Sequence, residues 1–229
     1  MESYQLLEHR WAEFIGRDPG LVVACSSGTA ALHLALEALK VRPFGSEVVV
    51  PDFTMVACAR SVVMAGLMPR FVDCDKTLLM DDGDPFGNVT VEPYSAFMGV
   101  HVYGRRLDMD WIHSVVNSSP VIEDMAEIHG VNPHPDTEAA CWSFYRNKII
   151  GGEEGGAIAF KEKDVATYAR QLRSLGMTPS HDFIHHPRGH NYRLANSLAE
   201  RILLAVEGYG SALARRRAVS YTHLRAHET

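Results

Sequence analysis

Residues 21–39 read LVVACSSGTAALHLALEAL, and this stretch decides the fold class. The apolar run 21–25 is typical of a short buried strand, and residues 26–29 lead into a helix, 30–39, that is rich in alanine and leucine. Apolar strands and helices alternate in the same way along the rest of the chain. Such alternation predicts an α/β fold with three layers, in which helices cover both faces of a mostly parallel central sheet.

The further elements follow this alternation. Residues 2–16 have the apolar spacing of an amphipathic helix, and Thr54 is expected to cap a helix that ends at Gly66. An acidic, glycine-bearing loop is expected at 81–87. Helices are also expected at 109–116, 163–175 and 194–206, and strands at 48–51, 70–73, 98–103, 121–124, 139–145 and 156–160.

The bulk composition excludes several classes of protein. The chain has 229 residues, 46% of them hydrophobic and 22% charged, which is typical of a soluble globular protein. The net charge of −6 does not indicate binding to nucleic acid or to an anionic membrane. The apolar runs are too short to span a bilayer and no signal peptide is evident, so we expect a cytoplasmic protein. The four cysteines form no CxxC pair and are interpreted as reduced thiols.

Lys148 ends the run CWSFYRNK, residues 141–148, and is followed by the glycine-rich segment IIGGEEGG. Ser143 lies five residues before it, near the end of an apolar segment. This setting suits an amine that forms a Schiff base, because a desolvated lysine readily becomes a neutral nucleophile. Taken alone, Lys148 would more often be a solvated surface charge.

Three other positions have both a binding and a structural interpretation. Ser27-Gly28-Thr29 could cradle a phosphate at a helix N-terminus or be an ordinary cap. Asp124, at the carboxyl end of a predicted strand, could pair with a protonated ring nitrogen or cap the next turn. Ser143 could bind phosphate or be a structural hydroxyl. A phosphate cradle, a strand-end aspartate, a serine and a lysine in this order together predict a pyridoxal phosphate site.

Several other polar residues are less informative. Glu127 and His129 could hydrogen-bond a ligand or be solvated, and Asn191 to Arg193 could present polar groups to an anion or cap a helix. The histidines His181, His185, His186 and His190 are loosely spaced among prolines and glycines, so no metal site is expected.

With these motifs, the chain resembles the DegT/DnrJ/StrS family of sugar aminotransferases, a branch of the fold-type-I pyridoxal phosphate enzymes. The SFYxNK motif is most similar to perosamine-synthase-like members, which aminate a 4-keto-6-deoxy sugar on a nucleotide carrier. The resemblance covers nearly all of residues 5–215. Its segments are SSGTAALHLAL (26–36), EVVVPDFTMVA (47–57), VHVYGRRLDM (100–109), VIEDMAEIHG (121–130), SFYRNKIIGGEEGG (143–156) and GHNYRLANSLAE (189–200).

The resemblance implies a role for each matching residue. Lys148 would form the Schiff base with the cofactor and move the proton, and Asp124 would keep the pyridine nitrogen protonated. The backbone of Gly28 and Thr29 and the hydroxyl of Ser143 would hold the phosphate.

Three further roles are also implied. Glu127 would lie near the phenolic oxygen of the cofactor. Met55 replaces the usual aromatic residue over the pyridine ring. Asn191 would reach the phosphate from the partner subunit, which implies a homodimer with a shared active site.

The implied reaction is a transamination that takes the amino group of glutamate and delivers it to a nucleotide-linked keto-deoxy sugar. One alternative is sugar dehydration, although family members with that activity replace the lysine by histidine. The other is a non-catalytic regulatory or scaffold protein that keeps the pyridoxal phosphate fold, for which Met55 leaves some room.

The family pattern also predicts the domain organisation. Residues 1–215 would be the large, cofactor-binding domain, lacking the family's leading segment, and the small C-terminal domain would be largely missing. Residues 219–229 have no periodicity and are expected to be a non-native tail. Within the large domain, Glu153 replaces the first glycine of the usual GEGG, and Gly151-Gly152 replace a common pair of threonines.

Overall fold

The computed structural model describes residues 1–41, 46–80, 96–116, 119–178, 183–186 and 188–226, with side chains described as far as residue 219. The predicted acidic loop at 81–87 and His181 lie outside the described residues.

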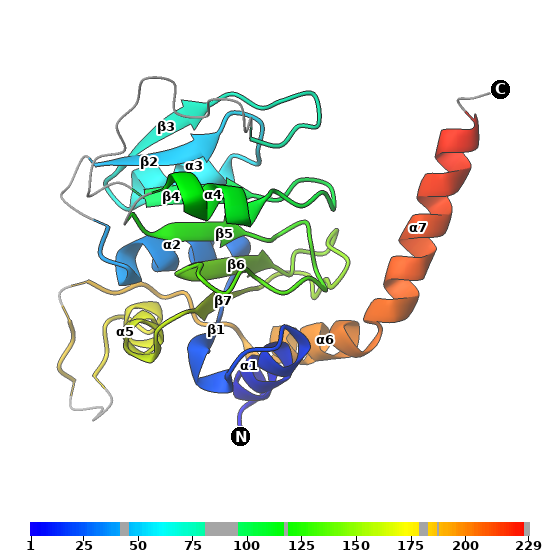
Figure 1. Ribbon diagram of the computed structural model, residues 1–229. Coiled ribbons are helices and arrows are strands. Elements are labelled where there is room, and N and C mark those ends of the chain that lie inside the picture. Colours follow the sequence, from blue (N-terminus) through cyan, green and yellow to red (C-terminus); the bar gives the residue numbers. More distant parts are fainter. Residues whose placement is uncertain (42–45, 81–95, 117–118, 179–182, 187, 227–229) are drawn as a thin grey trace.

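Seven strands of the described chain form one sheet (Figure 1). Only β7 runs against its neighbours β1 and β6, and the other pairs are parallel, so the prediction of a mostly parallel sheet is confirmed. The order across the sheet is β1 (Val22–Cys25), β7 (Gly156–Phe160), β6 (Ala139–Ser143), β5 (Val121–Asp124), β4 (Ala96–Val100), β2 (Glu47–Pro51) and β3 (Met68–Val72).

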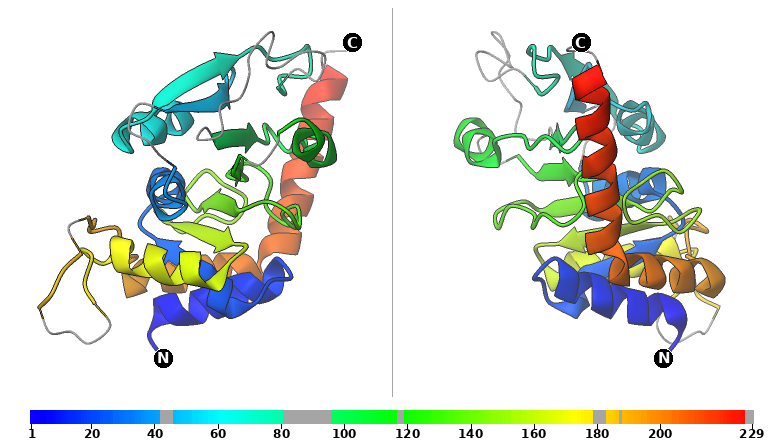
Figure 2. Two further views of the ribbon diagram at one scale, coloured as in Figure 1. Left: turned by 60° about the vertical axis from the view of Figure 1, so that its left-hand side comes forward. Right: turned by 90° about the vertical axis from the view of Figure 1, so that its right-hand side faces the viewer.

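Helices cover both faces of this sheet, as predicted. Alternate side chains of a strand point to opposite faces, and here both sets are apolar and pack against helices. Val23 and Cys25 of β1 pack into one core cluster with α2 (Gly28–Ala38), α3 (Ala57–Met64) and α5 (Lys163–Arg173). Their neighbours Val22 and Ala24 pack into another, with α1 (Ser3–Phe14) and α6 (Asn196–Glu207). A third cluster places α4 (Met109–Val115) on this second face, and Figure 2 shows α2 and α4 on opposite sides of the sheet.

Several predicted boundaries need correction. Thr54 does not cap α3, which begins at Ala57 after Val56; its hydroxyl instead lies 3.1 Å from Cys58 Sγ. Strand β4 starts at Ala96 and ends at Val100, before Tyr103 adopts a left-handed φ of 52° and turns the chain. Strand β6 ends at Ser143 instead of residue 145.

Helix α7 (Tyr209–Ala226) was not predicted from the sequence, and it stands beside the sheet in both figures. Alanine and arginine, which favour helices, are frequent in its first half. The backbone of residues 219–226, expected to lack regular structure, is part of this helix, whereas their non-native origin stays a prediction. No helix in the described parts of the chain has an apolar stretch long enough to cross a membrane.

Candidate active site

A cavity of ≈ 600 Å³ lies where the carboxyl ends of β4, β5 and β6 meet the first turn of α2. This is the edge of an open α/β sheet at which ligands usually bind. Seven of the eight residues predicted to hold the cofactor line it: Gly28, Thr29, Met55, Asp124, Glu127, Ser143 and Lys148. The structure therefore brings together residues that are up to 120 positions apart in the chain (28 to 148).

The first turn of α2 forms one end of the cavity. Ser27 is its N-cap and accepts a hydrogen bond from Ala30 N at 3.1 Å, so the capping interpretation is correct for Ser27. The earlier N–H groups, those of Gly28 and Thr29, have no partner within a helix and suit an anion. A Cβ at residue 28 would lie 2.7 Å from Ser143 Cβ, so only glycine lets the two segments meet here.

Asp124, the last residue of β5, lies deep in the cavity and is only 6% exposed. Its Oδ1 accepts a hydrogen bond from Ala126 N at 2.9 Å, and its Oδ2 accepts one from Cys58 Sγ at 3.1 Å. Burial raises the pKa of Asp124 above its ordinary value, and these two donors oppose the rise only in part. A cationic group in the cavity would favour the ionised form of this carboxyl.

Lys148 reaches the cavity from the hairpin between β6 and β7. Its Nζ donates a hydrogen bond to Glu127 Oε1 at 3.2 Å, and the other Glu127 oxygen accepts one from Tyr103 N at 2.9 Å. The turn itself is closed by Lys148 N, which donates to Tyr145 O at 2.8 Å. Backbone from three segments thus fixes the positions of the amine and of its counter-ion.

His129 hydrogen-bonds the backbone of this hairpin and does not line the cavity. It is buried, and its Nδ1 accepts a hydrogen bond from Ile150 N at 3.1 Å. Its Nε2 therefore carries the proton and donates to Ser143 O at 3.1 Å. Burial lowers the pKa of His129 to about 3, which keeps the ring neutral and in this tautomer.

The lysine turn, residues 144–155 between β6 and β7, contains the departures from the family pattern at Gly151, Gly152 and Glu153. Glu153 has a left-handed φ of 76°, a conformation that suits the glycine usually found there. The Glu153 side chain does not line the cavity, and its Oε1 lies 3.7 Å from Arg201 Nη1 at the surface. A Cβ at residue 152 would collide with Ile202 Cγ1, so the glycine there allows α6 to pack closely on the turn.

Met55 and Asn191 lie in different positions relative to the cavity. Met55 lines the cavity but is 64% exposed, and its sulfur accepts a hydrogen bond from Ala57 N at 3.1 Å. Asn191 lies outside the cavity, and its Oδ1 accepts hydrogen bonds from Arg193 at 3.2 and 3.3 Å. Its predicted contact with the phosphate therefore requires a second copy of the chain and stays a prediction.

Sequence reasoning missed three residues of the site. Cys58 donates a side-chain hydrogen bond to Asp124, and no spacing motif marks it. Phe53 and Tyr103 line the cavity with their ring centroids 6.2 Å apart. Both follow strand ends, in segments 47–57 and 100–109, and their position after a strand was the available signal. All four cysteines are free, as predicted.

The chain is similar in sequence to a known protein. The chain is 38% identical over 204 residues to the GDP-perosamine synthase of Caulobacter vibrioides, an alignment that covers 86% of this chain and 55% of that protein. It therefore spans little more than half of this relative.

Solved structures show the same fold. The aminotransferase TlmJ from Streptoalloteichus hindustanus superposes with a TM-score of 0.89 at 26% identity, covering 100% of this chain and 64% of that one. NtdA from Bacillus subtilis, solved with bound cofactor PMP, has a TM-score of 0.84 at 26% identity, covering 93% and 49%. The model of the DegT/DnrJ/EryC1/StrS aminotransferase family matches residues 2–225, and the chain belongs to this family.

Proposed function

We propose that this chain binds pyridoxal phosphate and serves a transamination from glutamate to a nucleotide-linked keto-deoxy sugar. The observation that carries the proposal is the single cavity that contains the amine of Lys148, the buried carboxyl of Asp124 and the first turn of α2. A ring-shaped cofactor with an aldehyde, a basic nitrogen and a phosphate needs these three partners at different points of its outline.

The residues present fit that cofactor. The phosphate would lie at the N–H groups of Gly28 and Thr29, beside the Ser143 hydroxyl, which the absence of a side chain at residue 28 allows to lie against the helix start. The ring nitrogen would face Asp124, whose raised pKa indicates a buried carboxyl short of positive partners. Lys148 would face the aldehyde, with Glu127 beside it.

Pyridoxal phosphate supplies, when bound, an aldehyde that reacts with amines and a ring that withdraws electrons from the substrate carbon. Lys148 then acts as the acid and base: its neutral amine takes the proton from the α-carbon of glutamate and later returns a proton to the amine-bearing sugar carbon. Glu127 stabilises the ammonium form of Lys148 between these transfers, since the two groups already form an ion pair at 3.2 Å. Asp124 in its ionised form keeps the ring nitrogen protonated.

The substrate class rests on similarity. The 38% identical relative is named for a GDP-linked amino sugar, which supports a nucleotide-linked keto sugar as acceptor. The PMP bound to NtdA supports the cofactor. A homodimer in which Asn191 completes the site of the other subunit belongs to the same proposal.

Absorbance spectroscopy of the full chain tests the proposal. Addition of pyridoxal phosphate is expected to produce a visible band that glutamate removes, and borohydride reduction should leave the cofactor mass on the peptide that contains Lys148. Lys148→Ala should abolish the band and turnover, because Lys148 is the only lysine among the described residues that line the cavity. Lys161→Ala is the matched control, since this surface lysine pairs with Asp136 and Glu138 away from the cavity.

Two results would contradict the proposal: a folded chain that forms no band at saturating pyridoxal phosphate, or a reduced cofactor attached to a lysine other than Lys148. A band that forms normally but does not respond to glutamate would favour the non-catalytic alternative.

A further inference from the structure

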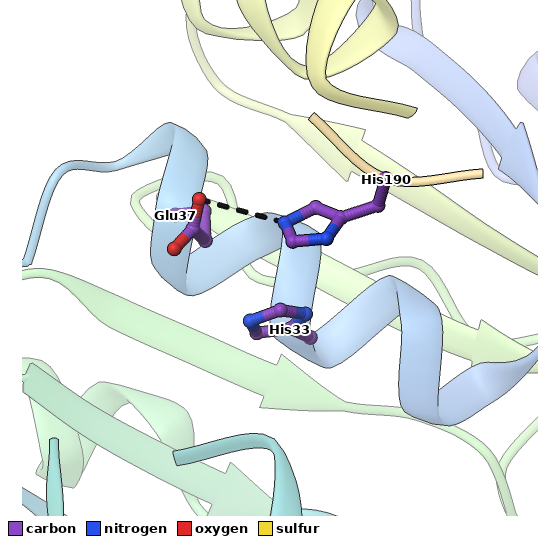
Figure 3. Close-up of side chains that lie close together, drawn as sticks. All are labelled: His33, Glu37 and His190. Carbon is purple, nitrogen blue, oxygen red and sulfur yellow. Dashed lines mark ion pairs between the residues drawn. The ribbon is translucent and has the colours of Figure 1, made fainter. Parts of the chain in front are cut away.

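A second cluster of polar side chains lies along α2, apart from the cavity (Figure 3). His33 and Glu37 are four residues apart on this helix, so they share one face of it. His190 comes from the segment before α6 and faces both of them. One potential ligand atom from each residue lies within 4.8 Å of the other two.

His33 provides the buried part of the cluster and is only 3% exposed. Its Nδ1 lies 3.2 Å from the Tyr192 hydroxyl, which can accept a hydrogen bond from the ring. Its Nε2 is buried and has no hydrogen-bond partner among the described residues. In the tautomer that donates Nδ1–H to Tyr192, Nε2 presents a lone pair. Metal-binding histidines usually donate their other ring N–H to a neighbouring acceptor in this way.

His190 and Glu37 complete the cluster. His190 Nε2, which is likewise buried without a hydrogen-bond partner in the described chain, lies 3.6 Å from Glu37 Oε2.

We infer that His33, Glu37 and His190 form a binding site for one divalent transition-metal ion, with zinc as the best match to the donors. Two imidazoles and one carboxylate are a common zinc ligand set, and they leave a fourth position for water. Ligand atoms about 2.1 Å from a tetrahedral ion lie about 3.4 Å apart, so atoms that are now up to 4.8 Å apart must approach by as much as about 1.4 Å. Glu37 and His190 are partly accessible and can make this movement, whereas His33 is fixed by burial.

The ion would replace the ion pair between Arg188 and Glu37. Arg188 Nη1 lies 3.6 Å from Glu37 Oε1, at the exposed side of the cluster, and would move away when the ion binds. The site would tie α2 to residues 188–192, a connection that already includes the hydrogen bond from Ser26 N to Tyr192 O at 2.8 Å. Since none of the three ligands lines the cavity with Lys148, the ion would stabilise the fold and would take no part in catalysis.

The sequence pointed away from this site. His190 was grouped with His181, His185 and His186, and that spacing predicts no metal. The partners of His190 lie more than 150 positions earlier in the chain, on a helix that only the fold brings beside it.

Calorimetric titration of the chelator-treated full chain with Zn²⁺ alone, without pyridoxal phosphate, tests the inference. One Zn²⁺ per chain should bind and raise the Tm, because a ligand that binds only the folded state stabilises it. Mg²⁺ should have no such effect, because it prefers oxygen ligands. Glu37→Gln and His190→Gln should each weaken Zn²⁺ binding at least about tenfold, and Tyr192→Phe should weaken it about tenfold.

The double variant His185→Gln/His186→Gln is the matched control, since it removes two exposed imidazoles of the same loop and should leave binding unchanged. Thermal unfolding without zinc shows whether each variant is folded. The inference is overturned if the wild-type chain binds no Zn²⁺, if the Glu37→Gln and His190→Gln chains bind it as tightly as the wild type, or if only the control variant loses binding.

Discussion

Glu123 and Asp124 are neighbours on β5, and both carboxyl groups are almost completely buried, yet their surroundings differ sharply. Successive side chains of a strand point to opposite faces, so Glu123 faces the α4 side of the sheet and Asp124 the α2 side. Glu123 accepts hydrogen bonds from His101 Nε2 at 3.0 Å and from His134 N at 2.8 Å. Asp124 accepts one from a backbone N–H and one from a thiol, which is a weak donor.

The pKa values of the two groups express this difference. Burial would raise the pKa of Glu123, but the hydrogen bonds from His101 and Thr137 outweigh it, and the pKa lies below its ordinary value. Burial dominates at Asp124, where the pKa is raised. A buried carboxylate with enough donors stabilises the fold, whereas one with too few donors, facing a cavity, is suited to hold a cationic ligand.

The largest expected effect comes from removing the charge that the fold needs. Glu123→Gln should lower the free energy of unfolding by about 3 kcal/mol, because it leaves His101 and the His134 N–H with a poorer acceptor in a buried site. Denaturant unfolding of the cofactor-free chain measures this. The folded variant should still bind pyridoxal phosphate normally, and a loss of cofactor binding in a fully folded variant would contradict the separation of the two faces.

The pH dependence of stability sharpens the same point. Because the pKa of Glu123 is lowered on folding, its stabilisation is present above the ordinary value of 4.5 and is lost as the pH falls through the folded pKa. The difference in unfolding free energy between wild type and Glu123→Gln should therefore shrink on acidification below about pH 4.5. A difference that stays constant from pH 7 to pH 3 would show that the charge of Glu123 is not its source.

Asp124→Asn should weaken cofactor binding without lowering the stability of the fold, which is the opposite of the effect expected for Glu123→Gln. Loss of the carboxylate should weaken pyridoxal phosphate binding about 30-fold, equivalent to about 2 kcal/mol, because the cationic ring nitrogen loses its buried partner. The cofactor-free chain should be as stable as the wild type or slightly more stable at pH 7, since an ionised group with a raised pKa opposes folding above that pKa. Cofactor titration and denaturant unfolding measure both quantities, and unchanged cofactor affinity would refute the assignment.

Cys58 offers a smaller test of the Asp124 side. Cys58→Ala removes the donor 3.1 Å from Asp124 Oδ2 and should weaken cofactor binding about fivefold, or about 1 kcal/mol. Cys58→Ser keeps a donor and should restore most of the affinity. Equal losses in both variants would indicate a packing role for the thiol instead of a hydrogen-bonding one.

The smallest effect is expected in the lysine turn, which also belongs to the cavity side. Glu153→Gly removes a left-handed non-glycine residue that costs about 1–2 kcal/mol, but it adds about 0.5–1 kcal/mol of chain entropy in the unfolded state. The net gain in unfolding free energy should be about 0.5 kcal/mol. Glu154→Gly, the neighbouring exchange in the same turn, is the control and should not be stabilising.

Much of the site was predictable because its residues lie in short local patterns. Lys148, Ser143 and the start of α2 are each recognisable within about ten residues, and the strand-end position of Asp124 indicated the sheet edge at which ligands bind. Cys58 was not predictable, because a buried thiol beside a carboxyl has no local signature. Thr54 was misassigned for a similar reason: its hydroxyl contacts Cys58 Sγ instead of capping α3.

The amino-acid sequence by itself indicated most of the strands and helices up to α6 and singled out the cavity residues Gly28, Asp124 and Lys148, since periodicity and local motifs depend only on neighbouring residues. Only the tertiary structure decided that Glu123 and Asp124 differ, and that His190 lies beside His33 and Glu37. The physical reason is the same in both cases: hydrogen-bond partners and burial come from segments far apart in the chain, and they exist only once the sheet and its helices are packed.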